Sequence, residues 1–122
     1  MTARDFGFPP QLRLKKPDEY KKVFASPVKS SDQYFTLLAV RNEFDHPRLG
    51  LAIAKKNIKK AVNRNVIKRT VRENFRIQQR NLGGMDIVVL ARRDAVDAPL
   101  ELLRKSLDRH WLRLISRCAS RS

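Results

Sequence analysis

The segment 55–80 most constrains the fold of this chain, because its composition is helical throughout and it ends at Gly83-Gly84. At about 100° per residue, Arg64, Lys68, Arg72 and Arg76 advance along one side of such a helix, within an arc of roughly 140° that includes Asn65 and Arg69. The opposite side is largely apolar and consists of Val62, Val66, Ile67, Thr70, Val71 and Ile77. The pattern predicts a helix that packs through its apolar side and exposes a cationic side.

The flanking segments supply a sheet and two more helices. The branched apolar run 86–91 predicts a buried strand, and 33–40 and 48–54 predict two strands that pair as a hairpin around a turn at 42–47. A further short strand is weakly indicated near 28–30. A helix is expected between Lys16-Pro17 and Ser26-Pro27. The last helix should follow Pro99 and pack through an apolar stripe formed by Leu100, Leu103, Leu107, Trp111 and Leu114.

These elements predict one domain, 1–122, with an α+β fold: an α/β sandwich in which three helices pack on a mixed sheet of about four strands. Residues 1–11 should form an extended arm, and residues 118–122 a frayed tail.

The charge balance points to a polyanionic partner. The chain has 27 Lys and Arg residues against 12 acids, a net charge of +15. In segment 55–76 like charges recur at i,i+4 with a single acid, Glu73, a spacing that destabilises an isolated helix. Arginine binds phosphate through its planar guanidinium, and asparagine can bind base edges, so nucleic acid is favoured over a membrane surface. The single cysteine, Cys118, and the absence of long apolar runs predict a cytoplasmic protein without membrane contact.

The residues from Ala54 to Glu73 closely resemble the signature helix of the bacterial ribonuclease P protein component, with Arg64-Asn65 and Lys68-Arg69 in register. Leu12-Arg13-Leu14, Tyr20 to Phe24, Arg48 to Leu51 and Asp86 to Arg92 agree with the same family. The resemblance covers roughly residues 8–114. It implies a ribosomal-protein-S5-domain-2-like fold with a left-handed β-α-β crossover.

The resemblance also implies partners and roles. The catalytic ribonuclease P RNA would remove the 5′ leader of precursor tRNA with magnesium that the RNA requires, and the protein itself would hold no cofactor or metal and supply no catalytic residue. The positions that would contact this RNA are Lys55, Lys56, Lys59, Lys60, Arg64, Asn65, Lys68, Arg69, Arg72 and Arg76. The leader would contact Tyr20, Phe24, Tyr34 and Leu37. From periodicity alone, Tyr20 and Phe24 would be assigned to the core, because they share a helix face with Val23. Either Tyr34 or Phe35 could face the leader.

Two other functions are compatible with the composition. A general ribosomal or structured-RNA-binding protein would bind RNA without affecting tRNA maturation. A protein-only nuclease would need its own acid–base or metal-ligand set, yet His46 and His110 stand apart in the sequence without ligand spacing.

Overall fold

The computed structural model describes residues 9–120. The elements in chain order are η1 (Pro10–Leu12), α2 (Pro17–Ala25), β1 (Val28–Ser31), β2 (Phe35–Arg41), β3 (Arg48–Ala52), α3 (Ala61–Leu82), β4 (Met85–Ala91), η2 (Arg93–Ala95) and α4 (Leu100–Ser120). Most of the predicted arm, residues 1–8, lies outside the described residues, and its end forms the short turn η1. Residues 118–120 belong to α4, where the sequence predicts a frayed tail.

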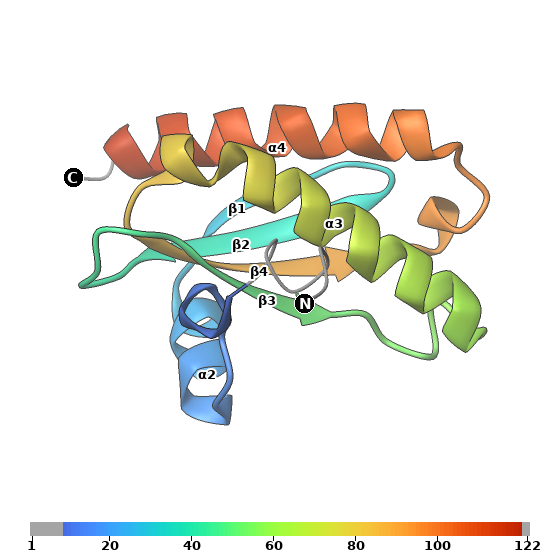
Figure 1. The fold of residues 1–122 in the computed structure, drawn as a ribbon, viewed down its shortest axis with the longest axis horizontal. Coiled ribbons are helices and arrows are strands. Elements are labelled where there is room, and N and C mark those ends of the chain that lie inside the picture. The colour runs from blue at the N-terminus through green and yellow to red at the C-terminus, as the bar shows by residue number, and fades with distance from the viewer. Residues whose placement is uncertain (1–8, 121–122) are drawn as a thin grey trace.

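The four strands form one mixed sheet in the order β1-β2-β4-β3, with β4 antiparallel to β2 and parallel to β3 (Figure 1). The weakly indicated strand near residue 28 is therefore confirmed as β1. The predicted hairpin of β2 and β3 is wrong, because β4 lies between them. The uninterrupted apolar run of β4 is buried over most of its length and suits the centre of a sheet, where neighbours satisfy both of its edges.

Helices cover both faces of the sheet. α3 and α4 lie together over one face, and α2 lies on the other (Figure 1). The side chains of β2 alternate between these layers: Phe35, Leu37 and Ala39 join the large core under α3 and α4, whereas Leu38 joins a smaller cluster with Val23 of α2. The predicted α+β sandwich, with three α-helices and a four-stranded mixed sheet in the described residues, is confirmed.

α3 begins at Ala61, six residues later than the composition predicts. Before it, the amide groups of Asn57 and Ile58 both donate to the carbonyl of Ala54, forming a turn, and Ile58 is buried in the core. The helix ends where Gly83 adopts φ +67°, a backbone conformation that favours glycine. Two residues assigned to its packed side are in fact exposed, Val62 by 63% and Ile77 by 66%, since the buried stripe is narrower and follows Ile67, Val71 and Phe75.

α4 packs through Leu103, Leu107, Trp111 and Leu114, as predicted, whereas Leu100 in its first turn is exposed. The Trp111 ring meets Phe75 of α3 edge to face with centroids 6.0 Å apart, and its Nε1 donates to Asn74 Oδ1 at 2.5 Å. Both α3 partners of Trp111 are buried, so this contact fixes the two helices against each other.

Candidate nucleic-acid interface

The outward side of α3 is cationic. The helix contains six basic residues and one acid, Glu73, and Arg69, Arg72 and Arg76 are exposed on its surface. Its packed side places Ile67, Val71 and Phe75 in the core, so the helix cannot turn these cations inward. Lys68 is half-buried and Asn65 is exposed. A sustained row of like charges along one helix is suited to a polyanion.

Arg72 of α3 lies near a second cation, Arg13. Partial desolvation, followed by the nearby charge of Arg13, lowers the pKa of Arg72 below its ordinary value. Arg13 comes from the chain just after η1, where it forms a bridge to Leu49. The cationic surface of α3 therefore continues onto the N-terminal segment, an extension that helix periodicity alone could not reveal.

Arg64 has a structural role besides any role in binding. Its Nη1 donates to the carbonyl oxygens of Ile58 and Lys59, at 3.0 and 2.8 Å. These bonds tie the segment before α3 to the first turn of the helix. Arg64 was predicted on the exposed cationic side, but it is half-buried and bonded to the backbone. Substitution of the exposed Arg69 therefore tests the surface with less effect on the fold.

The four lysines of the predicted set do not lie on the helix. Lys55, Lys56, Lys59 and Lys60 belong to the segment before α3, and all four are exposed. A pocket of about 490 Å³ lies between this segment and the loop after β4, lined by Lys56, Asn57, Lys59, Lys60, Asn63, Arg93, Val96 and Asp97. The lysines and α3 thus form two adjoining basic surfaces instead of one continuous helix.

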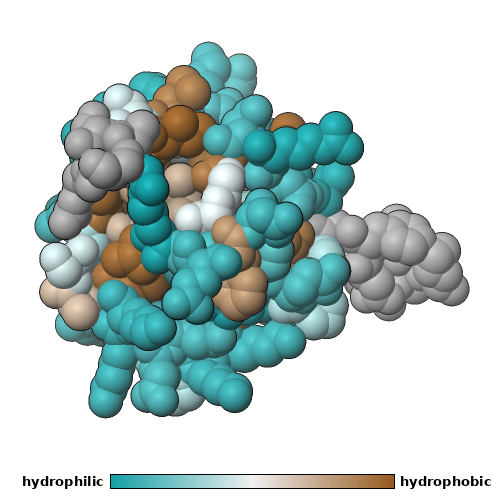
Figure 2. All heavy atoms as spheres, turned by 90° about the vertical axis from the view of Figure 1, so that its left-hand side faces the viewer, coloured by the Kyte–Doolittle hydropathy of each residue, from teal (hydrophilic) through white to brown (hydrophobic). Residues whose placement is uncertain are grey.

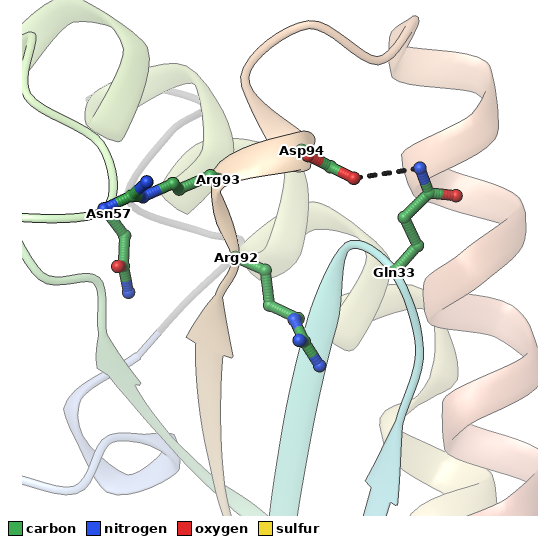
Figure 3. A pocket seen from close by; sticks show the side chains of 5 residues that line it. All are labelled: Gln33, Asn57, Arg92, Arg93 and Asp94. Carbon is green, nitrogen blue, oxygen red and sulfur yellow. Dashed lines mark hydrogen bonds between the residues drawn. The ribbon is translucent and has the colours of Figure 1, made fainter.

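A second pocket, of about 500 Å³, adjoins the first at the end of β4 (Figure 3). It is lined by Gln33, Asn57, Arg92, Arg93 and Asp94, and Gln33 Nε2 donates to Asp94 Oδ2 at 2.9 Å. Arg92 and Arg93 were not among the predicted contact residues. Their sequence signal was an arginine pair directly after a buried strand, at the edge where β4 ends.

α2 carries two aromatic residues, Tyr20 and Phe24, and packs on the face of the sheet opposite α3 and α4. Phe24 is 46% exposed, so it is not a core residue, and Tyr20 is half-buried. The Tyr20 ring rests on Gly50 of β3, where an added Cβ would lie 2.7 Å from the ring. Half-buried apolar side chains of Val40, Ala52 and Leu90 pack beside it. This side of the sheet presents aromatic and apolar surface to solvent.

The other two predicted leader contacts lie elsewhere. Leu37 is fully buried under α3 and α4, so its assignment to an accessible surface is wrong; the alternation of β2 presents Leu38 to the opposite face. Tyr34 precedes β2 and packs against the same large core, which also contains Phe35. Neither ring lies in the cluster beside α2.

A serine, a histidine and an aspartate meet between β1, the following turn and α4. His110 Nδ1 lies 2.7 Å from Ser30 Oγ, and His110 Nε2 lies 3.1 Å from Asp32 Oδ2. Ser30 and His110 are completely buried, so no substrate can reach the serine. Asp32 also accepts hydrogen bonds from Ser106 and from the amides of Tyr34 and Phe35. The group joins α4 to the sheet and is not a hydrolytic site.

Within residues 9–120, no three His, Cys, Asp or Glu side chains are placed to hold a metal ion. In the same range no helix is sufficiently long and apolar to cross a membrane.

Comparisons with known proteins agree with this geometry. The family model described as Ribonuclease P matches residues 8–115. A ribonuclease P protein component from Methylococcus capsulatus is 48% identical over 122 residues, which cover 100% of this chain and 95% of that protein. The solved structure of the Staphylococcus aureus RNase P protein has 34% identity and a TM-score of 0.76, covering 84% of this chain and 93% of that one. The Thermotoga maritima RNase P protein has 30% identity and a TM-score of 0.74, with 83% and 96% covered.

Proposed function

The chain belongs to the ribonuclease P protein family, and on that premise we propose that the α3 surface binds the ribonuclease P RNA while the sheet face beside α2 holds the 5′ leader of precursor tRNA. Membership makes it the protein subunit of an endoribonuclease that acts in tRNA processing, with the ribonuclease P RNA as its partner.

The cationic side of α3 is the observation that supports the RNA contact. Arg69 and Arg76 are exposed, and neither forms a salt bridge within residues 9–120. Guanidinium groups bind phosphate oxygens in pairs of parallel hydrogen bonds, and each neutralised phosphate releases condensed counterions. We assign Lys68, Arg72 and Asn65 to the same contact. Lys55, Lys56, Lys59 and Lys60 contribute phosphate contacts from the adjoining segment, and Arg64 holds that segment in place.

Tyr20 and Phe24 support the leader contact. A single-stranded leader exposes the faces of its bases, and aromatic rings stack on these faces with little dependence on sequence. Phe24 has the greater exposed area of the two rings, and Tyr20 is positioned by its contact with Gly50. We therefore expect Phe24 to stack on a leader base and Tyr20 to support it from the side of β3.

We assign the hydrolysis to the RNA, together with the magnesium that it uses. The described residues provide no metal-binding group, and their one serine–histidine–aspartate set is closed to substrate. The roles proposed for this chain therefore use no protein-bound ion. A general RNA-binding protein is the less favoured function, because the family match spans nearly the whole chain.

The test is cleavage of a precursor tRNA at low magnesium, with the chain and a bacterial ribonuclease P RNA added separately and together. We expect efficient cleavage only when both are present. Phe24→Ala should weaken binding of a substrate with a leader by about tenfold, as expected for the loss of one stacked base, and leave binding of mature tRNA unchanged. If the chain adds nothing to cleavage by the RNA, the contacts proposed here with the ribonuclease P RNA and with the leader are wrong.

A further inference from the structure

The loop between β2 and β3 carries an exposed aromatic residue, Phe44, which contacts His46 of the same loop and Arg48 at the start of β3. Phe44 is 50% exposed, and its ring stacks on His46 with centroids 5.3 Å apart and planes inclined by 23°. The guanidinium carbon of Arg48 lies 4.7 Å from the centroid of the Phe44 ring. Figure 2 views the end of the molecule that carries this loop, where apolar surface in brown lies among hydrophilic side chains.

This aromatic surface is rigidly held. Asn42 Oδ1 accepts a hydrogen bond from the Phe44 amide at 2.9 Å, and Asn42 Nδ2 donates to the His46 carbonyl and to Asp86 Oδ1. Gly84 packs directly under the loop, where an added Cβ would lie 2.2 Å from the Phe44 carbonyl oxygen. The exposed ring is therefore fixed to the end of the sheet before any ligand arrives, which lowers the entropy lost on binding.

Arg48 forms the base of the same site. It donates to both carboxylate oxygens of Asp86, at 2.9 and 2.7 Å, and to Glu19 Oε2 at 2.7 Å. The other oxygen of Glu19 accepts from the amides of Lys15 and Lys16. One ion-pair network thus joins the aromatic loop to the segment that carries the two lysines.

These residues surround a pocket of about 310 Å³, which we call the Phe44 pocket; its lining is Pro10, Gln11, Arg13, Lys15, Lys16, Glu19, Phe44, His46 and Arg48. Four of these residues are cations, but the charge of Arg48 is offset by its salt bridges to Glu19 and Asp86. The positive charge of the pocket therefore comes from Arg13, Lys15 and Lys16. The loop acids Glu43 and Asp45 are exposed but do not line the pocket. An anion is therefore favoured on the lysine side of the pocket and disfavoured on the outer side of the loop.

We propose that the Phe44 pocket binds one unpaired nucleotide of an RNA, with its base against the Phe44 ring and its phosphate beside Lys15 and Lys16. A flat aromatic surface next to cations matches the two parts of a nucleotide, whereas an acidic peptide would use the cations alone. The site is separate from the lysine segment and from the aromatic residues of α2. It adjoins the α3 surface through Arg13, so one RNA could reach both. The inference rests on the proposed function only in taking RNA as the partner.

The first test compares affinities for ribonuclease P RNA at a fixed salt concentration. Phe44→Ala should weaken binding by about tenfold, whereas Phe44→Tyr, which keeps the stacking surface, should stay within about twofold of the unmodified chain. Lys15→Ala/Lys16→Ala should weaken it as well, by removing the phosphate contact. Leu112→Ala is the matched control, since Leu112 is 67% exposed on α4, outside every surface assigned here. Thermal unfolding should be nearly the same for all variants.

The second test detects stacking directly. In Phe44→Trp, the emission of the introduced indole should be quenched by a single-stranded oligoadenylate, while Trp111 is buried and should not respond. The quench should be reduced when Lys15→Ala/Lys16→Ala is added. If Arg69→Ala weakens RNA binding but Phe44→Ala does not, and no quench occurs, the pocket is not a nucleotide site and the α3 contact stands. If neither substitution weakens binding, both the pocket and the proposed α3 contact are wrong.

Discussion

α3 and α4 are two helices of nearly equal length on the same face of the sheet, yet their cations have different surroundings. α3 has six basic residues and one acid in 22 residues, and α4 has five basic residues and two acids in 21. In α4, Lys105 lies 3.8 Å from Glu101, Arg109 lies 3.9 Å from Asp32, and Arg117 donates to the Lys29 carbonyl. In α3, Lys68, Arg69 and Arg76 form no salt bridge within residues 9–120.

The difference shows that the number of cations on a helix does not by itself identify a nucleic-acid surface. The two helices differ by one cation, but the charges of α4 are partly neutralised by neighbours from the same fold. Exposed pairs of this kind contribute little stability, so their main effect is on the local potential. An RNA would find weaker attraction along α4 than along α3.

Salt dependence should give the largest effect. If about six phosphates are neutralised, affinity for the ribonuclease P RNA should fall about 10³-fold between 50 and 200 mM monovalent salt. Lys68→Ala/Arg69→Ala in α3 should reduce the slope of log affinity against log salt by about two. The matching pair in α4, Arg104→Ala/Lys105→Ala, should leave the slope unchanged. Equal slopes for the two double variants would remove the distinction between the helices.

At a single salt concentration, the α3 and α4 double variants should also differ in RNA affinity, by a smaller factor than the salt effect. Charged hydrogen bonds contribute roughly 1.5 kcal/mol or more each, so the α3 double variant should bind about 100-fold more weakly. The α4 double variant should lose less than about threefold. Fluorescence anisotropy with labelled RNA measures both, and circular dichroism checks that the fold is retained. A comparable loss in both would mean that α4 also contacts the RNA.

The contact between the helices provides a stability prediction. Trp111→Phe removes the donor to Asn74 Oδ1 and leaves that buried acceptor without its partner, so the free energy of unfolding should fall by about 2 kcal/mol. RNA affinity of the folded variant should not change, because neither residue is on the α3 surface. Urea unfolding measures the free energy of unfolding, and fluorescence anisotropy measures the RNA affinity. A loss of RNA affinity with intact folding would show that the α4 contact sets the position of the RNA-binding side.

The smallest effect should come from His110 in α4. Burial lowers the pKa of His110, although Asp32 acts in the opposite direction. The unfolded chain therefore binds a proton near pH 6.5 that the folded chain binds only at lower pH, so the free energy of unfolding should decrease as pH falls below about 6.5. His110→Gln should remove this dependence between pH 7 and 5.5, where Asp32, with a pKa of about 2, stays ionised. A flat profile for the unmodified chain would contradict this assignment.

Much of the fold could be predicted because the decisive patterns are local. The stripe of Leu103, Leu107, Trp111 and Leu114 identifies α4 and its packed side, and Gly83 identifies the end of α3. Strand pairing is different, since the turn residues at 42–47 mark a change of direction but do not determine which strands become neighbours. The hairpin prediction failed for that reason, as β4 arrives from a distant part of the chain and pairs with both β2 and β3.

The candidate site shows the same limit. Charge and helical spacing were sufficient to place Arg69, Arg72 and Arg76 on an exposed surface. They could not show that residues 55–60 leave the helix, because lysine is a good helix former and the buried position of Ile58 depends on tertiary packing. Leu37 was misplaced because a shift of one position along a strand reverses the side to which a residue points.

The central position of β4 has a consequence for the order in which this chain can fold. Among the strands of residues 9–120, β3 pairs only with β4, and Leu49 on its other edge forms a single bridge to Arg13. During synthesis β3 therefore has no strand to pair with until residues 85–91 have been made. The whole of α3 is made before that strand. Its positive charges are therefore present on a nascent chain whose sheet is incomplete, and the apolar side of α3 has only a partial surface on which to pack. Pairings between segments so distant in sequence form slowly, so completion of the sheet should limit the folding rate.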